Sequence, residues 1–275
     1  MVLQAEQGGG WDIVRSGLPG YEGVELVGYR DRAGRGLDMR VLPSPKVTIV
    51  LVFDGELRID RTRPVEAGIA SGVGVNSVRV DGRDVACVDI HLSPLAAHSV
   101  LGGAGAELAG TVVGFEDLWG AEGRRLRAEL EAAPRWDERF RRLRMVLAGK
   151  LDTNRPVDPE VAFAWRGLVA TGGRGRIGDL AAETGWTRKR LWSRFTAQIG
   201  VTPKRAAKIV RLAPAIEAIT EGIPAADVAL RYGYADQSHL TRDLRELAGY
   251  TPGALYRDWL EGGSARGTIV QDTMR

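Results

Sequence analysis

The chain has 275 residues, of which 44% are hydrophobic and 27% are charged, and its net charge is +3. These values are typical of a soluble globular protein that is long enough for two domains. Cys87 is the single cysteine, which excludes an intrachain disulfide and a four-cysteine zinc site. The N-terminus has no signal-peptide pattern, and no run of about 18 apolar residues predicts a membrane span. We therefore expect a cytoplasmic protein without a membrane partner.

The N-terminal half carries strand signals. Residues 1–20, with Gly8-Gly9-Gly10 and Pro19-Gly20, are predicted to be a flexible arm. Extended segments are predicted at 24–27 and 39–42, and an apolar, β-branched run at 46–53 ends at Asp54-Gly55, a hairpin-turn signal with a return strand at 56–60. The same pattern predicts strands at 74–80 and 85–92 around a turn at Asp81-Gly82. Several short strands between glycine turns indicate a sandwich or a barrel.

The pattern becomes helical after Asp117. Trp136, Phe140, Leu143 and Leu147 follow one another at helical spacing and form one apolar stripe on a charged helix. This stripe has two interpretations, packing against the domain's own sheet or a seam between two subunits. Residues 151–159, LDTNRPVDP, are the predicted linker, residues 160–261 the second domain, and residues 262–275 a disordered tail.

The second domain contains one pattern twice. Ala181-x3-Gly185-Trp186 precedes Leu191 and Gly200-Val-Thr-Pro203, and Ala229-x3-Gly233-Tyr234 precedes Leu240 and Gly249-Tyr-Thr-Pro252. The offset is 48 residues at the first glycine and 49 at the Thr-Pro pair. Each copy is predicted to be a short helix, a glycine turn and a second helix, which is a helix-turn-helix. The second helix of such a motif can lie in a DNA major groove.

A basic segment coincides with the first copy. Residues 174–211 hold ten bases against only Asp179 and Glu183, a local charge of +8, whereas residues 1–150 hold 20 bases and 21 acids. Such a segment is either a solvated charged face or the footprint of a phosphate-backbone binder. Its coincidence with the helix-turn-helix pattern favours DNA. The ten bases are Arg174, Arg176, Arg188, Lys189, Arg190, Arg194, Lys204, Arg205, Lys208 and Arg211.

Candidate DNA contacts lie on the second helix of each copy. Thr187, Asp236 and Thr202 are predicted N-caps, the last followed by Pro203 at the first helical position. Leu191, Phe195, Leu240 and Leu244 are expected to face the core. Trp192 is either a core or a DNA residue, and His239 either contacts phosphate or packs in the turn. The candidate contacts are Arg188, Lys189, Arg190, Trp192, Ser193 and Arg194 in the first helix, and Gln237, Ser238, His239 and Arg242 in the second.

The segment Gly233-Tyr-Ala-Asp-Gln-Ser-His-Leu-Thr-Arg242, with Gly249-Tyr-Thr-Pro252, resembles the signature of the AraC/XylS family of bacterial transcription regulators. The resemblance covers about residues 158–260 and implies two helix-turn-helix motifs joined by a long helix, with Lys189, Ser193, Gln237, Ser238 and Arg242 at base-contacting positions. The chain departs from the family at Leu244, where Phe is usual, and at Ser193, where Arg is frequent. Residues 21–150 resemble, more weakly, the cupin-like β-barrels with helices that serve such regulators in ligand sensing and dimerisation.

A two-domain α+β protein is therefore expected, with a cupin-like β-barrel and helices before an all-α domain with two helix-turn-helix motifs. The expected function is a DNA-binding transcription regulator, not an enzyme, that binds double-stranded promoter DNA as a homodimer and responds to a small-molecule effector. RNA polymerase is a further candidate partner, and no cofactor is expected. One alternative is an effector-independent regulator. The other is a metal-dependent cupin enzyme fused to a DNA-binding domain, which is disfavoured because only His91 and His98 lie in this region and both were expected to follow a strand.

Overall fold

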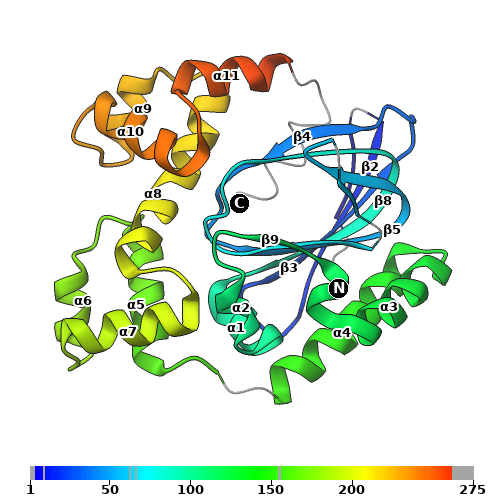
Figure 1. The fold of residues 1–275 in the computed structure, drawn as a ribbon, viewed down its shortest axis with the longest axis horizontal. Helices are drawn as coiled ribbons and strands as arrows, with labels where there is room; N and C mark the ends of the chain where they lie inside the picture. The colour runs from blue at the N-terminus through cyan, green and yellow to red at the C-terminus, as the bar shows by residue number, and fades with distance from the viewer. Residues whose placement is uncertain (1–3, 9, 62, 66, 154–155, 262–275) are drawn as a thin grey trace.

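The computed structural model describes residues 4–8, 10–61, 63–65, 67–153 and 156–261. A curved antiparallel sheet with helices precedes an all-α region, so the expected two-part α+β organisation is confirmed (Figure 1). The expected tail lies outside the described residues. The sheet runs in the order β1-β2-β3-β8-β5-β7-β9, with β4 paired to β8 and β6 to β5. Its strands are β1 (Gln4–Gly8), β2 (Trp11–Gly17), β3 (Val24–Asp31), β4 (Leu37–Val41), β5 (Val47–Ile59), β6 (Arg63–Val65), β7 (Gly68–Ser71), β8 (Val78–Leu92) and β9 (Val112–Gly114).

The predicted hairpin turns at Asp54-Gly55 and Asp81-Gly82 are wrong. β5 and β8 run through both dipeptides and pair with each other from Val47↔Leu92 to Ile59↔Val80. The pairing register shifts between Val52 and Glu56, so Asp54-Gly55 forms an irregularity within a long strand. A β-bulge and a hairpin turn use the same residue types, because both need a local change of direction and a tolerant backbone.

The predicted flexible arm is also wrong over most of its length. β1 pairs with β2, and β2 pairs with β3 from Trp11↔Asp31 to Gly17↔Glu25. Trp11, Ile13 and Val14 are buried in the sheet domain. Gly10 lies in the turn between β1 and β2, and Pro19-Gly20 lies in the connection between β2 and β3.

Helices close one side of the sheet. α1 (Pro94–Leu101) and α2 (Ala104–Glu107) follow β8, and α3 (Phe115–Ala132) and α4 (Trp136–Thr153) follow β9. Phe140, Leu143 and Leu147 are fully buried, and the Trp136 ring packs edge-on against Phe53 of β5 with ring centroids 5.9 Å apart. The apolar stripe of α4 therefore packs against its own sheet, and the subunit-seam interpretation of this stripe is wrong.

The all-α region consists of two groups of helices joined by α8 (Pro203–Thr220), and Figure 1 shows them beside the sheet. α8 is one continuous helix through Pro214. The predicted linker at 151–159 is too long at both ends, since α4 extends to Thr153 and α5 begins at Pro159. The remaining helices are α5 (Pro159–Ala170), α6 (Ile177–Glu183), α7 (Arg188–Ile199), α9 (Ala225–Arg231), α10 (Gln237–Ala248) and α11 (Pro252–Glu261).

Candidate nucleic-acid interface

Two helix-turn-helix units, α6–α7 (copy one) and α9–α10 (copy two), have the same local construction. Gly185 and Gly233 have φ of +69° and +73°, which fits the predicted tight turn between the helices. The Thr187 hydroxyl accepts a hydrogen bond from the Arg190 amide at 3.2 Å, and the Asp236 carboxylate accepts one from the His239 amide at 2.7 Å. Both predicted N-caps are confirmed, as is Thr202 at the start of α8.

The two second helices correspond residue by residue. Each has 12 residues, begins directly after its N-cap and ends at a left-handed glycine, Gly200 or Gly249. A fixed offset of 49 residues therefore relates α7 to α10. Leu191 and Phe195 are buried in copy one, and their equivalents Leu240 and Leu244 are buried in copy two, as predicted. The opposite face of each helix is open.

The open face of α7 carries Lys189, Trp192, Ser193, Thr196 and Ala197, which line one shallow surface hollow. The sequence left open whether Trp192 is a core residue or faces DNA. Its side chain is 44% exposed, so it is not a core residue. Thr196 and Ala197 were not among the candidates. Their signal in the sequence was the helical period, since they lie three to five residues after Trp192 and Ser193 on the same face.

The open face of α10 carries Gln237, Ser238, Thr241, Arg242 and Arg245, which line a second hollow. Three of these residues were predicted, and Thr241 and Arg245 were missed. Arg245 follows Arg242 by three residues and therefore extends the same face. The two hollows present potential hydrogen-bond donors and acceptors on two helices of equal length, which is what two recognition helices need.

Two candidate contacts instead hold the turns. The Arg190 guanidinium lies over the Trp186 ring, 4.3 Å from its centroid. At the equivalent positions of copy two, the His239 ring packs edge-on against Tyr234, with centroids 5.2 Å apart, and its Nδ1 accepts a hydrogen bond from the Ala235 amide at 3.4 Å. In both copies the third residue of the second helix packs on the aromatic residue that follows the turn glycine. This geometry favours a role in the turn, and not a direct contact with DNA, for Arg190 and His239.

Arg194 and Arg188 also face other parts of the protein. The Arg194 guanidinium binds both carboxylate oxygens of Asp158, at 2.7 and 3.0 Å, just before α5. This pair lowers the pKa of Asp158. The Arg188 side chain lies over Gly178 of α6. Side chains that follow one another along a helix point in different directions, so a run of candidates in the sequence cannot all face one groove.

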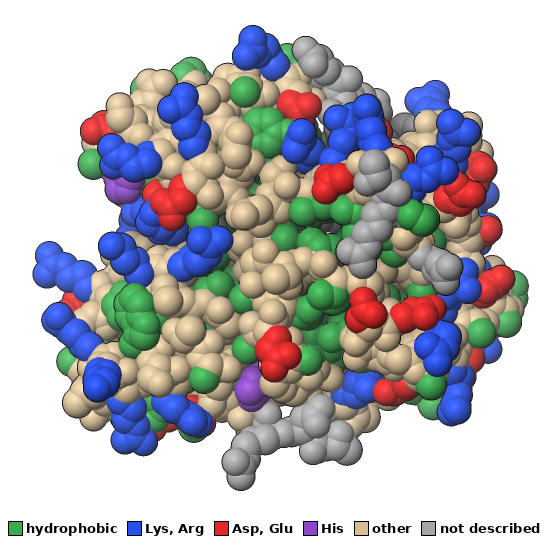
Figure 2. Space-filling view, viewed as in Figure 1, with side chains coloured by type: hydrophobic (Ala, Val, Ile, Leu, Met, Phe, Trp, Pro, Cys, Tyr) green, Lys and Arg blue, Asp and Glu red, His purple; other side chains and the backbone are tan. Residues whose placement is uncertain are grey.

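The basic segment is therefore not one continuous DNA-binding patch. Arg205 donates to the Gly74 carbonyl at 3.3 Å, and Lys208 and Arg211 bind the buried Asp243 carboxylate at 3.0 and 3.1 Å. Burial acts to lower the pKa of Lys208, and hydrogen bonds to Glu246 and Asp243 outweigh it, so the pKa is raised. Lys and Arg side chains still cover much of the helical half at the left and top of Figure 2.

The network around Asp243 holds copy two together. Besides Lys208 and Arg211 of α8, His239 lies 3.8 Å from the same carboxylate, and Arg211 stacks over the Tyr234 ring at 4.4 Å. Burial raises the pKa of the Tyr234 hydroxyl to about 12. This network fixes the turn and the second helix of copy two against α8. It could not be predicted from the sequence, because its members come from α8, from α10 and from the turn before α10.

Copy one is held by the sheet domain. α7 contacts α1 and α2, and Gly200 at its C-terminus lies directly against the Ala106 carbonyl and Ala109. The His98 imidazole of α1 donates a hydrogen bond to the backbone of Gln198, and burial lowers the pKa of this imidazole. The Gln198 side chain accepts from the Asp158 amide at 3.0 Å. His98 is thus part of a contact between the two halves of the chain.

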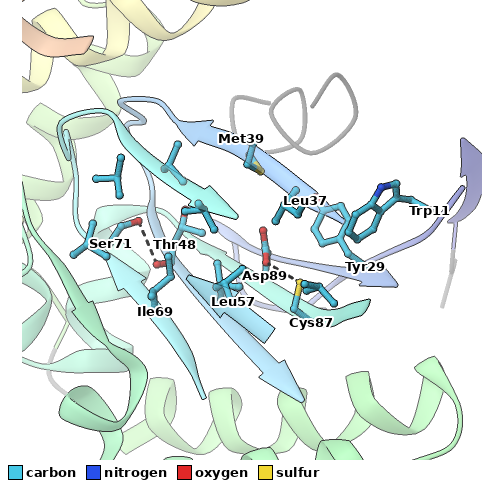
Figure 3. A pocket seen from close by; sticks show the side chains of 16 residues that line it. Trp11, Tyr29, Leu37, Met39, Thr48, Leu57, Ile69, Ser71, Cys87 and Asp89 are labelled. Atoms are coloured by element: carbon cyan, nitrogen blue, oxygen red, sulfur yellow. Dashed lines mark hydrogen bonds between the residues drawn. The ribbon is translucent and has the colours of Figure 1, made fainter. Parts of the chain in front are cut away.

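The curved sheet encloses an apolar cavity of about 60 Å³, shown in Figure 3. Its lining comes from seven strands and includes Trp11, Tyr29, Met39 and Ile69, with Thr48, Ser71 and Asp89 as polar members. In the figure, Ser71 and Thr48 lie at one end and Trp11 and Tyr29 at the other.

His91 lies within β8, which corrects the expectation that it follows a strand. It is buried beside Thr48, whose hydroxyl is 3.2 Å from its Nδ1. Burial lowers its pKa to about 3, and the charges of Lys46 and Arg15 act in the same direction. Within the described ranges, no three His, Cys, Asp or Glu side chains are placed to hold a metal ion. No helix among those residues is long and apolar enough to cross a membrane.

A helix-turn-helix domain model matches residues 180–258, which include both second helices and the turns between. Residues 180–258 therefore form a helix-turn-helix domain of the kind that the repeated sequence pattern predicts. An uncharacterized HTH-type transcriptional regulator of Bacillus subtilis, YbfI, is 34% identical over 64 residues, which span 23% of this chain and 23% of that relative.

Several solved structures are similar to the chain at low identity. ToxT from Vibrio cholerae is 12% identical, with 87% of this chain and 98% of that chain covered and a TM-score of 0.45. The C-terminal domain of AraT, a response regulator from Geobacillus stearothermophilus, is 17% identical over 37% of this chain and 86% of its own, with a TM-score of 0.35. The AraC-like transcriptional activator CuxR is 16% identical over 79% and 83%, with a TM-score of 0.34.

Proposed function

We propose that the protein regulates transcription by binding specific sites in double-stranded promoter DNA through α7 and α10 together. The observation that carries this proposal is the pair of matched open faces on two helices of equal length, related by a fixed offset and joined through α8. Lys189 and Ser193 on α7, and Gln237, Ser238, Arg242 and Arg245 on α10, are the side chains that face outward there. Arginine suits guanine and glutamine suits adenine in the major groove.

A small-molecule effector is proposed to act through the sheet domain. The cavity of about 60 Å³ is far below the roughly 300–1,000 Å³ of drug-sized ligand sites, so an effector of that size requires the cavity to widen. Ile69 and Ser71 of β7 and Val112 of β9 line it. Widening would therefore move β7 and β9 and the segments that follow or precede them.

Those segments touch the DNA-binding half. Gly74 follows β7 by three residues, its carbonyl accepts from Arg205 of α8, and Ile209 of α8 packs against it. The segment before β9 is tied to the same loop, because the Gly110 amide donates to the Val73 carbonyl at 3.2 Å. An effector that binds one arrangement of the cavity better than the other would shift how α7 and α8 are held. A homodimer, with RNA polymerase as a further partner, is the proposed working form.

The proposal is tested by selecting duplexes from a genomic library with the full-length protein at two salt concentrations. The expected result is a site with two half-elements about one helical turn apart. Binding without any sequence preference, lost uniformly as salt rises, would contradict specific readout. The effector is sought by thermal shift with apolar small molecules, with Met39→Trp, which fills the cavity, as the blocked control. A regulator whose DNA binding no ligand changes is the effector-independent alternative.

Arg242→Ala tests the assignment of α10. It is expected to weaken binding by about 1–3 kcal/mol at one base pair and to relax the preference at that position, because a bidentate contact to guanine is lost. The matched control is Lys204→Ala at an exposed position early in α8. That change should weaken all duplexes alike and reduce the salt dependence, as loss of a phosphate contact does. An unchanged preference in Arg242→Ala would remove Arg242 from the readout.

A further inference from the structure

The open faces of α7 and α10 differ in chemistry at every corresponding position. Trp192, Ser193, Thr196 and Ala197 of α7 stand where Thr241, Arg242, Arg245 and Glu246 stand in α10. The α10 face is charged and can form many hydrogen bonds. The α7 face has one charged residue, Lys189, and combines the apolar Trp192 and Ala197 with two hydroxyl groups, of which that of Thr196 donates to the Trp192 carbonyl at 2.8 Å.

Trp192 is the largest side chain on that face. Among the described tryptophans it is the exposed one, at 44%, while Trp11 and Trp165 are buried and Trp119, Trp136, Trp186 and Trp259 are partly buried against the core. An exposed indole costs free energy in water, and a partner that covers it recovers that cost. Its neighbours Lys189 and Ser193 favour DNA as this partner. A lysine can bind a backbone phosphate while the ring beside it contacts the bases.

The geometry points to Trp192 as a specificity residue that reads thymine methyl groups, so that α7 selects its half-site by apolar contact while α10 selects by hydrogen bonds. In the major groove the thymine C5-methyl is the apolar group that distinguishes a base pair. This inference rests on the proposed function and names the chemistry of one of its two half-sites. It predicts a thymine-containing half-site under α7 and a guanine- or adenine-containing one under α10.

Deoxyuridine provides the test, because it lacks only the C5-methyl group of thymidine. After site selection, each thymidine of the α7 half-site is replaced in turn by deoxyuridine and the dissociation constant is measured with the full-length protein. At one or more positions the wild type should bind about three- to fivefold more weakly, which is the effect of one buried methyl group. Trp192→Ala should bind the thymidine site more weakly and should no longer respond to that replacement.

Two variants serve as controls. Trp192→Leu keeps an apolar side chain and should retain part of the methyl response, and Thr241→Ala, the matched position in copy two, should retain all of it. Circular dichroism checks that each variant is folded. A wild type that ignores deoxyuridine, or a Trp192→Ala protein that still responds to it, overturns the inference while leaving the proposed function intact. Failure to select any preferred duplex overturns both.

Discussion

Copy one and copy two share caps, turns and buried leucines, but different parts of the protein hold them. Asp243 in α10 binds Lys208 and Arg211 of α8 and is 1% exposed. Its equivalent in α7 is Arg194, which pairs at the surface with Asp158. Copy two is thus fixed to α8 by a buried charge network, whereas copy one packs against α1 and α2 of the sheet domain. A repeated backbone can therefore be held within the helical half in one copy and against the sheet domain in the other.

Removing the charge at these matched positions should give the largest difference in stability between variants of the two copies. Asp243→Ala leaves Lys208 and Arg211 without their carboxylate and is expected to cost about 3–5 kcal/mol of stability. Arg194→Ala removes an exposed pair that water and salt screen, so it should cost far less stability. Chemical denaturation followed by circular dichroism measures both. Equal losses would mean that copy two is not braced by its buried network.

The two C-terminal glycines give a second matched pair. Gly200 and Gly249 have φ of +87° and +73°, so alanine at either position meets backbone strain of about 1–2 kcal/mol. A Cβ at Gly249 meets open space, but one at Gly200 collides with the Ala106 carbonyl and Ala109 of the α2 region. We expect Gly200→Ala to cost about 2–3 kcal/mol and Gly249→Ala to cost the strain alone.

Hydrogen exchange localises the effect of these glycine variants. Amide protection in α1 and α2 should fall in Gly200→Ala and stay unchanged in Gly249→Ala, because only the first disturbs the contact between copy one and the sheet domain. Protection that falls equally in both variants would contradict the assignment of copy one to that contact.

Low pH should destabilise the sheet domain, which contacts copy one. His91 lies near the end of β8, shortly before α1, and its pKa is about 3 in the fold against an ordinary value of 6.5. The unfolded chain takes up a proton near pH 6.5 that the fold excludes, so the stability from His91 is full above that pH and falls as the pH drops toward 3. At pH 5 the loss is about 2 kcal/mol.

His91→Asn should remove this part of the acid sensitivity. The measurement is the free energy of unfolding at pH 7.5 and pH 5 for both proteins, with amide protection of α7 and α10 corrected for intrinsic exchange. We expect α7 to lose protection before α10 in the wild type on acidification. Identical pH slopes for the wild type and His91→Asn would show that His91 is not the group responsible.

How far the sequence predicts this protein depends on the range of the interactions involved. N-caps Thr187, Asp236 and Thr202 and the buried pair Leu240 and Leu244 were predictable, because each depends on residues within about four positions. The failed turn predictions at Asp54-Gly55 and Asp81-Gly82 have the opposite cause, because only the pairing of β5 with β8 decides whether the chain turns or continues as a strand there.

The sequence by itself determined the two helix-turn-helix units, their offset and the faces that their second helices bury, because helical periodicity and capping are local. Only the tertiary structure decided which bases remain free for DNA. Arg194, Arg205, Lys208 and Arg211 look alike in a charge count, yet their partners come from other helices or from the sheet domain. A charged side chain is long enough to reach such partners, and the fold brings those partners within its reach.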